Sequence, residues 1–387
     1  MRPSVLLLYK EIIPSVRLCI YEQLLFLSKR GLIDFQSYKM GETNKYKLND
    51  CDVVISVRGD SLYEYKLLDL LKKSGKHIIY VLDDDLLNVP PHIDCYKYYS
   101  LEFIKYNIQN IIQTSDIFLS PSKRLLQKYN TFAKDNGLIE QPALHTQEFN
   151  KLNEKIRIGF AGSIDRTKDI DELLTKVIHE LICKYGDNIS IEFFGAKPKV
   201  VEDYNLNYYP YEDCYEKYNE TMLSLDWDIG IAPLIDNEFN SCKHYNKFIE
   251  YCSYGIIGVY SKVDPYKDIV QEGINGFLCE NTVDSWVATL SFCIENKDIL
   301  EEIRKNELYI CKEQYTLEKS SEIVLGYLKK LKKVARGSQI KGVCILKLRI
   351  IYIINRLYIS IKLNGIGFIG ALIKKIVKYL KYKILGK

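Results

Sequence analysis

The sequence predicts an α/β protein with two doubly wound domains, each built on a parallel β-sheet. Over residues 1–150, short continuous apolar stretches alternate with stretches of helical periodicity, which is typical of parallel strands covered by helices on both faces. The same alternation starts again at residue 156. The chain has 387 residues, enough for two such domains and a C-terminal extension.

The first domain is expected to span residues 1–150. Its predicted strands are residues 5–9, 52–57, 77–82 and 117–120. Helices are expected at residues 16–30, 63–74, 104–114 and 122–129, the last capped by Ser122. Residues 1–10 are interpreted as the first strand, because their apolar run is too short for a signal peptide.

The second domain is expected to span residues 151–330, after a linker near residues 141–154. Its predicted strands are residues 156–162, 189–194, 228–234 and 256–260. A helix is expected at residues 169–185, and another ends at residues 221–225. Two successive units of this kind indicate two domains separated by a cleft.

Residues 241–255 are predicted to form one short helix, with Ser241 as N-cap and Gly255 as its end. Lys243, Lys247 and Glu250 then share one helix face. A helix start with two lysines attracts an anion such as a phosphate, and a carboxylate further on accepts hydrogen bonds from sugar hydroxyls. The alternative is a solvated face with a Lys–Glu pair.

The order of elements around this helix resembles the donor-binding half of family-4-like glycosyltransferases, which have the GT-B fold. A strand and loop at residues 228–234 precede it, and a strand at 256–260 and an Asn275-Gly276 turn follow it. The resemblance implies two Rossmann-like domains facing a cleft, with an N-terminal acceptor domain and a C-terminal nucleotide-sugar donor domain. It also implies that helical residues 298–333 cross back to the first domain.

The same resemblance assigns roles within the run Asn240-x-x-Lys243-x-x-x-Lys247-x-x-Glu250-Tyr. Glu250 would contact the donor sugar or ribose, and Lys243 and Lys247 would lie near its phosphates, with Asn240 beside them. Two positions depart from the family. A second Glu is common where this chain has Cys242, and a Pro is common where it has Ile257.

Two further stretches are candidates for donor binding. The loop after the strand at 156–162 places Gly162, Ser163, Arg166 and Lys168 where the family has a glycine loop with a basic residue; the alternative is an ordinary strand-to-helix turn. By the same resemblance, Gly195 and the tyrosines around Tyr209 would lie near the nucleotide base. Ordinary aromatic packing is the alternative for these tyrosines.

Three consecutive carboxylates, Asp83 to Asp85, follow the strand at 77–82, on the sheet edge that faces the ligand crevice. Acceptor binding or acid/base chemistry by Asp84, helix capping by Asp84 or Asp85, and a metal site are the alternatives, the metal being least favoured. Arg17, after the first strand, is a candidate for binding a donor or acceptor phosphate, or else a surface arginine. Arg58, at the end of the second predicted strand, is by its position a cleft residue, and the alternative is a surface arginine.

The charge distribution sets the last 57 residues apart. Residues 331–387 hold 14 of the 54 Lys and Arg and no acidic residue, whereas the rest of the chain holds all 50 Asp and Glu. Residues 373–384 predict a basic amphipathic helix, with Ile373, Ile376, Leu380 and Ile384 opposite four lysines. This tail favours an anionic membrane surface over nucleic acid, since no nucleic-acid motif is present and Ile and Leu dominate. Eleven scattered cysteines without a CxxC pair indicate a reducing compartment and no zinc site.

These observations predict a glycosyltransferase of the hexosyltransferase type, peripheral on the cytoplasmic face of the cell membrane, that needs no metal or other cofactor. The nucleotide-sugar donor would be a substrate, and the acceptor a glycan, expected to be lipid-linked, in cell-surface polysaccharide synthesis. The family implies retention of the anomeric configuration. Two alternatives remain: a catalytically inactive module that binds a glycan or a partner, and an oxidoreductase, which the missing GxGxxG disfavours.

Overall fold

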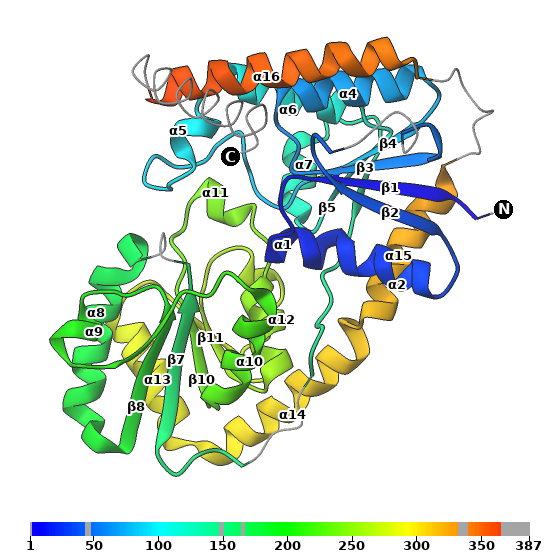
Figure 1. The fold of residues 1–387 in the computed structure, drawn as a ribbon. Helices are drawn as coiled ribbons and strands as arrows, with labels where there is room; N and C mark the ends of the chain where they lie inside the picture. Colours follow the sequence, from blue (N-terminus) through cyan, green and yellow to red (C-terminus); the bar gives the residue numbers. More distant parts are fainter. Residues whose placement is uncertain (1, 43–47, 147–150, 164–166, 332–339, 365–387) are drawn as a thin grey trace, which may run out of the picture.

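The computed structural model describes residues 2–42, 48–146, 151–163, 167–331 and 340–364 (Figure 1). These residues form two six-stranded sheets, ordered β2-β1-β3-β4-β5-β6 and β12-β11-β10-β7-β8-β9. Every pairing within both sheets is parallel. The predicted fold class, two Rossmann-like parallel-sheet units, is confirmed. We call the two sheets with their covering helices the first lobe and the second lobe.

The first lobe carries helices on both faces of its sheet. Its strands are β1 (Ser4–Tyr9), β2 (Asp34–Lys39), β3 (Val53–Val57), β4 (His77–Val81), β5 (Ile117–Ser120) and β6 (Asn136–Leu138). Its helices are α1 (Pro14–Val16), a π-helical turn (Arg17–Tyr21), α2 (Glu22–Lys29), α4 (Leu62–Lys73), α5 (Tyr96–Tyr99), α6 (Glu102–Thr114) and α7 (Lys123–Tyr129).

The second lobe repeats this plan. Its strands are β7 (Ile156–Gly162), β8 (Ile189–Gly195), β9 (Asn207–Pro210), β10 (Ile229–Ala232), β11 (Ile257–Ser261) and β12 (Phe277–Cys279). Its helices are α8 (Thr167–Tyr185), α9 (Val200–Asp203), α10 (Tyr215–Leu225), α11 (Glu238–Ser241), α12 (Asn246–Tyr254), α13 (Val283–Glu295) and α14 (Lys297–Gln314).

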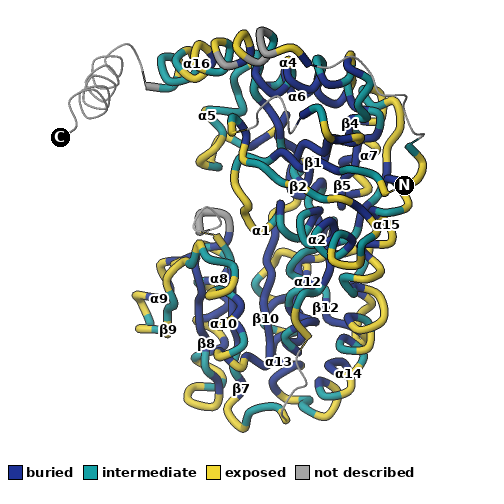
Figure 2. Tube along the Cα trace, turned by 45° about the vertical axis from the view of Figure 1, so that its right-hand side comes forward, coloured by how far each residue is buried: buried dark blue, intermediate teal, exposed yellow. Residues whose placement is uncertain are grey.

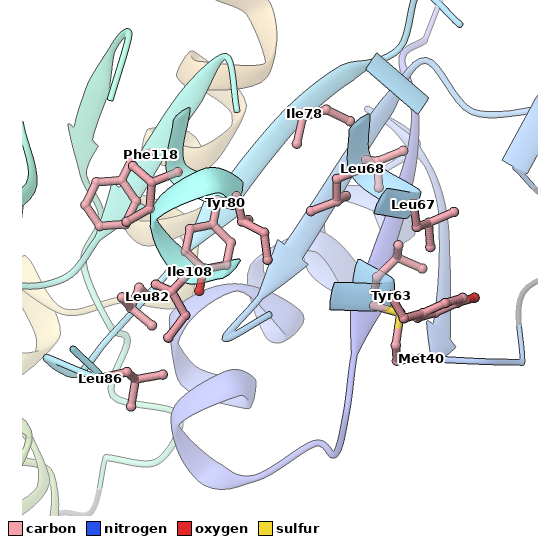
Figure 3. Close-up of a cluster of buried hydrophobic side chains, with 14 of the residues drawn as sticks. Met40, Tyr63, Leu67, Leu68, Ile78, Tyr80, Leu82, Leu86, Ile108 and Phe118 are labelled. Carbon is pink, nitrogen blue, oxygen red and sulfur yellow. The ribbon is translucent and has the colours of Figure 1, made fainter. Parts of the chain in front are cut away.

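Alternating side chains along each strand fill the two layers of the core. In β1, Leu6 and Leu8 pack in the cluster under α4 and α6, whereas Val5 and Leu7 pack in the cluster under α2. Figure 3 shows part of the first cluster, with Tyr80 and Phe118 from the strands against Ile108 from α6. Figure 2 shows the burial of the described residues, with buried strands inside and exposed helix faces outside.

The chain returns to the first lobe after α14, as expected for residues 298–333. A new helix, α15 (Leu317–Lys330), starts at the N-cap Thr316 and packs against α2, burying Val324 and Leu328 in the first lobe. The final described helix, α16 (Gly342–Asn364), lies against α4 (Figure 1). The amphipathic helix expected at residues 373–384 lies outside the described residues. Among the described residues, no helix combines the length and the apolar character that a membrane span requires.

Candidate active site

A cavity lies between the lobes, at the carboxyl ends of both sets of strands. It has a volume of about 570 Å³ and is lined by residues of both lobes, including Ser15, Arg58 and Asp84 from the first and Gly162, Lys243 and Glu250 from the second. A second cavity of about 260 Å³ adjoins it and shares Asp84, Gly162, Ser163, Lys243 and Lys247. Parallel α/β sheets bind their ligands at this end, so the cavity is the candidate site.

The helix predicted at residues 241–255 is two helices, and Ser241 is not its N-cap. Asn237 caps α11 by accepting a hydrogen bond from the Asn240 amide at 2.8 Å, and Ser241 is the last residue of that helix. Phe239 and Cys242 are buried in the apolar cluster of the first lobe, so α11 packs across the interface. The prediction that Gly255 ends the helix is confirmed, since Gly255 follows α12 with a left-handed φ of 68°.

Lys243 therefore lies in the connection before α12, where it meets a carboxylate of the other lobe. Its Nζ donates to Asp84 Oδ1 at 2.9 Å. Arg58 Nη1 contacts both Asp83 oxygens at 2.8 Å and Asp84 Oδ2 at 3.4 Å. Burial alone would lower the pKa of Arg58, but Asp83 and Asp84 raise it above its ordinary value. Four charged groups thus alternate in sign along the wall of the cavity.

Arg58 has a left-handed backbone, with φ 52°, although it is not glycine. Such conformations are strained for residues with a side chain and concentrate at functional sites. The conformation occurs where β3 ends, and the Arg58 amide still donates to the Val81 carbonyl at 2.9 Å. The structure places Arg58 in the cleft wall, which supports the cleft alternative over the surface one.

Lys247 and Glu250 lie on α12 and meet Tyr218 of α10. Lys247 Nζ and Tyr218 Oη donate to Glu250 Oε1 at 2.6 and 2.5 Å, and Lys247 Nζ is 3.1 Å from Tyr218 Oη. Burial, and then the charge of Glu250, raise the pKa of Tyr218 well above its ordinary value, so its hydroxyl stays protonated and donates. The ring of Tyr218 stacks on Phe194, with centroids 5.0 Å apart.

The ends of β7 and β8 bring two predicted glycines together. Gly195 has a left-handed φ of 87°, and a Cβ on it would lie 2.2 Å from the Gly162 carbonyl oxygen. The Ala196 amide donates to that same oxygen at 2.9 Å. Gly162, Ser163 and Gly195 all line the cavity. Arg166 and the side chain of Lys168 lie outside what the structure describes, so their roles remain predictions.

Two predicted site residues are not among those that line either cavity. Arg17 pairs instead with Glu216 and with Glu22, at 2.6 Å for the latter, and its guanidinium lies 4.9 Å from the Tyr215 ring centroid. Tyr209 packs edge-on against Phe194, with centroids 6.5 Å apart. Tyr211, two residues further along, lines the cavity in its place.

The sequence predicted the aromatic lining of the site only in part. Tyr211 belongs to the tyrosine stretch that was expected near the nucleotide base, whereas Tyr215, Tyr218 and Tyr254 were not expected to line the cavity. Tyr254 follows Glu250 by one helical turn, so this spacing could have identified Tyr254 as a residue of the same helix face. The other three come from the β9–α10 region, whose helix was recognised only in its last turn. Asn240, which was predicted, lines the cavity and donates through its side chain to the Ile235 carbonyl at 3.0 Å.

The three carboxylates of the run, Asp83 to Asp85, have different partners. Asp85 is buried and accepts from Lys128 at 2.6 Å, from Asn88 at 3.0 Å and from Tyr129. No helix begins within the described residues 86–95, so the helix-capping alternative is wrong. Within the described ranges, no group of three or more His, Cys, Asp or Glu side chains could hold a metal ion. Asp84 is the member of the run that reaches the cavity from the first lobe and meets a cation of the second.

Comparisons with known proteins identify the fold. No protein-family model and no curated protein sequence matches the chain. The solved structure of Anabaena HepE with UDP and glucose matches with a TM-score of 0.59 at 12% identity, over 85% of this chain and 100% of HepE. A glycosyltransferase from Rickettsia africae matches with a TM-score of 0.59 at 12% identity, over 85% of this chain and 98% of that one. The chain has the GT-B fold.

The same fold also serves other chemistry. A Listeria monocytogenes protein described as a UDP-N-acetylglucosamine 2-epimerase matches with a TM-score of 0.54 at 11% identity, over 88% of this chain and 100% of that one. Fold similarity alone therefore does not specify sugar transfer, and the argument for function has to come from the cavity.

Proposed function

We propose that the protein is a glycosyltransferase that moves a sugar, of the hexose type, from a nucleotide-sugar donor to a glycan acceptor without a metal. The observation that carries this proposal is the convergence of Lys243, Lys247, Glu250 and the Gly162 loop on one cavity between the lobes. This is the set that the family resemblance assigned to the donor. The neighbours HepE, solved with UDP and glucose, and the Rickettsia glycosyltransferase support the same class.

The donor would lie along the second lobe. Glu250 accepts hydrogen bonds well, so it suits a ribose or sugar hydroxyl, and the tyrosines beside it offer flat apolar faces to a base. Lys243 and Lys247 are now paired with Asp84 and Glu250. A diphosphate brings more negative charge than either carboxylate and would take over these lysines as partners.

Transfer would break the bond between the anomeric carbon and the diphosphate and form one to an acceptor hydroxyl oxygen. The lysines would stabilise the charge that grows on the leaving diphosphate. The acceptor proton needs a base or an outgoing phosphate oxygen to receive it. Asp84 is the carboxylate that the first, acceptor-side lobe contributes next to Lys243, so we assign it to acceptor positioning or proton transfer. By family resemblance the anomeric configuration would be retained.

The acceptor is proposed to be a lipid-linked glycan at the cytoplasmic face of the membrane, used in cell-surface polysaccharide synthesis. The support is the charge asymmetry: residues 331–387 carry 14 basic and no acidic residues. The competing function is a catalytically inactive binding module. Its support is Cys242, which stands where the family commonly has a Glu and is buried in the first lobe rather than lining the cavity.

The test compares two lysines, each of which forms an ion pair with a glutamate of its own helix. Lys247 bonds Glu250 at 2.6 Å in the cavity, and Lys176 bonds Glu172 at 2.9 Å on the exposed surface of α8. Lys247→Ala is expected to weaken binding of a UDP-sugar about 10- to 100-fold, the loss of one charge-assisted hydrogen bond. Lys176→Ala should leave the affinity unchanged. A thermal-shift screen of nucleotide sugars followed by calorimetry measures both.

Three outcomes separate the candidates. Binding together with transfer or slow donor hydrolysis supports the enzyme. Binding without turnover on any glycan acceptor supports the inactive module. Equal nucleotide affinity for the parent and Lys247→Ala contradicts the assignment of the diphosphate to this cavity.

A further inference from the structure

Helix α16 is held on the first lobe by one of its faces. Leu348 is buried in the apolar cluster beneath α4, and Tyr352 meets Tyr63 with ring centroids 5.1 Å apart. Further along, Tyr358 meets Phe103 at 5.1 Å. Figure 1 shows α16 across the end of the first lobe that is far from the second lobe. The helix is thus a fixed part of the molecular surface.

The opposite face of α16 exposes a row of large apolar side chains. Leu346, Ile350, Ile353 and Ile354 are 60%, 50%, 57% and 60% exposed. Their spacing of i, i+4, i+7 and i+8 places them along one stripe. Isolated apolar residues are normal on a surface, but a contiguous stripe of them marks a contact with a partner or a membrane.

The charged residues of α16 itself are all of one sign. The sequence of α16 contains Lys347, Arg349, Arg356 and Lys362 and no acidic residue. Lys347, Arg356 and Lys362 are exposed, and none of the three forms an ion pair with a described carboxylate. No acidic residue follows Glu322 anywhere in the sequence.

We infer that the outward face of α16, defined by Leu346, Ile350, Ile353 and Ile354, docks on an anionic lipid surface. The aliphatic side chains would enter the boundary between headgroups and acyl chains, while the basic residues beside them meet lipid phosphates. A second copy of the chain is a poorer occupant, because stacking two such faces would bring two purely basic helices together without a counter-charge.

This inference deepens the proposed membrane association and assigns it to a particular surface on the first lobe. It does not depend on the terminal helix expected at residues 373–384. It also predicts the orientation of the molecule: with α16 on the bilayer, the first lobe lies between the membrane and the second lobe. The cleft would then lie away from the lipid, which suits an acceptor whose growing end already extends from the membrane.

The experiment is sedimentation of the full-length protein with sucrose-loaded vesicles of phosphatidylcholine, with and without phosphatidylglycerol. The variant Ile350→Ser/Ile354→Ser removes half of the stripe. The matched control Ile274→Ser/Ile299→Ser alters two other isoleucines, 50% and 41% exposed, in the second lobe. We expect the parent to bind the anionic vesicles, the α16 variant to bind about tenfold more weakly and the control to bind like the parent.

Two results would overturn the inference. One is equal vesicle binding by the α16 variant and the parent, including the case in which neither binds. The other is a parent that is dimeric by analytical ultracentrifugation, becomes monomeric in the α16 variant and shows no vesicle binding that depends on the stripe. Nucleotide binding, measured without vesicles, tests the proposed enzyme function separately. Unfolding curves of both variants verify that they are folded.

Discussion

Three adjacent side chains of one type, Asp83 to Asp85, have three different surroundings. Asp83 pairs with Arg58, Asp84 reaches Lys243 across the cleft, and buried Asp85 is held by Lys128 and Tyr129. Their surroundings differ because the side chains of successive residues leaving a strand point to different sides. The run therefore separates into Asp84, which meets a cation of the second lobe, Asp83, which lines the adjoining cavity while paired with Arg58, and Asp85, which is held inside the first lobe.

Asp84 is the member of the run that meets Lys243, and its replacement tests the role proposed for it. Asp84→Asn removes the charge that competes for Lys243, so UDP should bind as tightly as in the parent or several-fold more tightly. If Asp84 handles the acceptor proton, turnover should fall about 10²- to 10⁴-fold. Calorimetry and a transfer assay measure the two effects, and an unchanged turnover would remove Asp84 from the chemistry.

Asp85 should behave in the opposite way. Asp85→Asn removes the buried negative charge and one of the two oxygens that accept from Lys128 and Tyr129, so we expect the first lobe to lose about 3 kcal/mol of unfolding free energy. Asp69→Asn, which removes only the exposed bond from Lys73 at 2.7 Å, should cost less than about 0.5 kcal/mol. Urea unfolding of both variants is the measurement. Equal losses of unfolding free energy in the two variants would mean that the burial of Asp85 does not increase its contribution to stability.

At the scale of elements, the strands found in the sequence are the central ones. The strands β1, β3, β4, β5, β7, β8, β10 and β11 were all expected, whereas β2, β6, β9 and β12 were not, and these four lie at the sheet edges in the described structure. Edge strands are short or only partly covered, as the alternating exposure of β2 shows. They therefore lack the continuous apolar run that is typical of a buried parallel strand.

The parts of the site whose residues lie close together in the sequence were predictable. Lys247 and Glu250 share a face because they lie one turn apart on α12, which spacing alone reveals. The break between α11 and α12 was not predictable, because Phe239 and Cys242 pack on the other lobe. Tyr218, which bonds Glu250, lies 32 residues earlier in the sequence. Contacts of this range depend on the completed fold.

The contact between the ends of β7 and β8 gives a test at this scale. Gly195→Ala places a methyl group 2.2 Å from the Gly162 carbonyl in a left-handed conformation. It should destabilise the second lobe by more than about 2 kcal/mol and weaken nucleotide binding. Gly273→Ala has a similar φ of 70° but meets nothing within 4 Å, so it isolates the backbone strain. Thermal unfolding with and without UDP compares them; equal effects would show that the two strand ends can move apart.

At the scale of the whole molecule, charged pairs join the lobes around the cleft. Besides Lys243 with Asp84, they are Arg17 with Glu216, Arg124 with Asp264, and Lys128 with Glu238 at 2.5 Å. Each unites a first-lobe and a second-lobe side chain. Arg17, predicted as a candidate for binding a donor or acceptor phosphate, thus pairs in this structure with a residue of the other lobe.

The pH dependence of this contact follows from Glu216. The hydrogen bond from Arg17 lowers the pKa of Glu216 from 4.5 to about 2. A carboxylate with a lowered pKa contributes stability above its ordinary pKa and loses it as the pH falls toward the lowered value. The difference in Tm between the parent and Glu216→Gln should therefore be full at neutral pH and vanish between about pH 4.5 and 2.

Glu220→Gln, an exposed change on the same helix α10, serves as the control and should follow the parent at every pH. If Glu216→Gln and the parent have the same Tm at neutral pH, the contact between Arg17 and Glu216 contributes nothing to joining the lobes.

The central claim is that the cavity between the lobes holds a nucleotide diphosphate on Lys243 and Lys247. A crystal structure of the full-length protein with UDP tests it most directly. The account predicts diphosphate oxygens within hydrogen-bond distance of both Nζ atoms, with Lys243 moved from Asp84 and Lys247 moved from Glu250. A nucleotide bound elsewhere, or one bound while both lysines keep their present carboxylate partners, would contradict it.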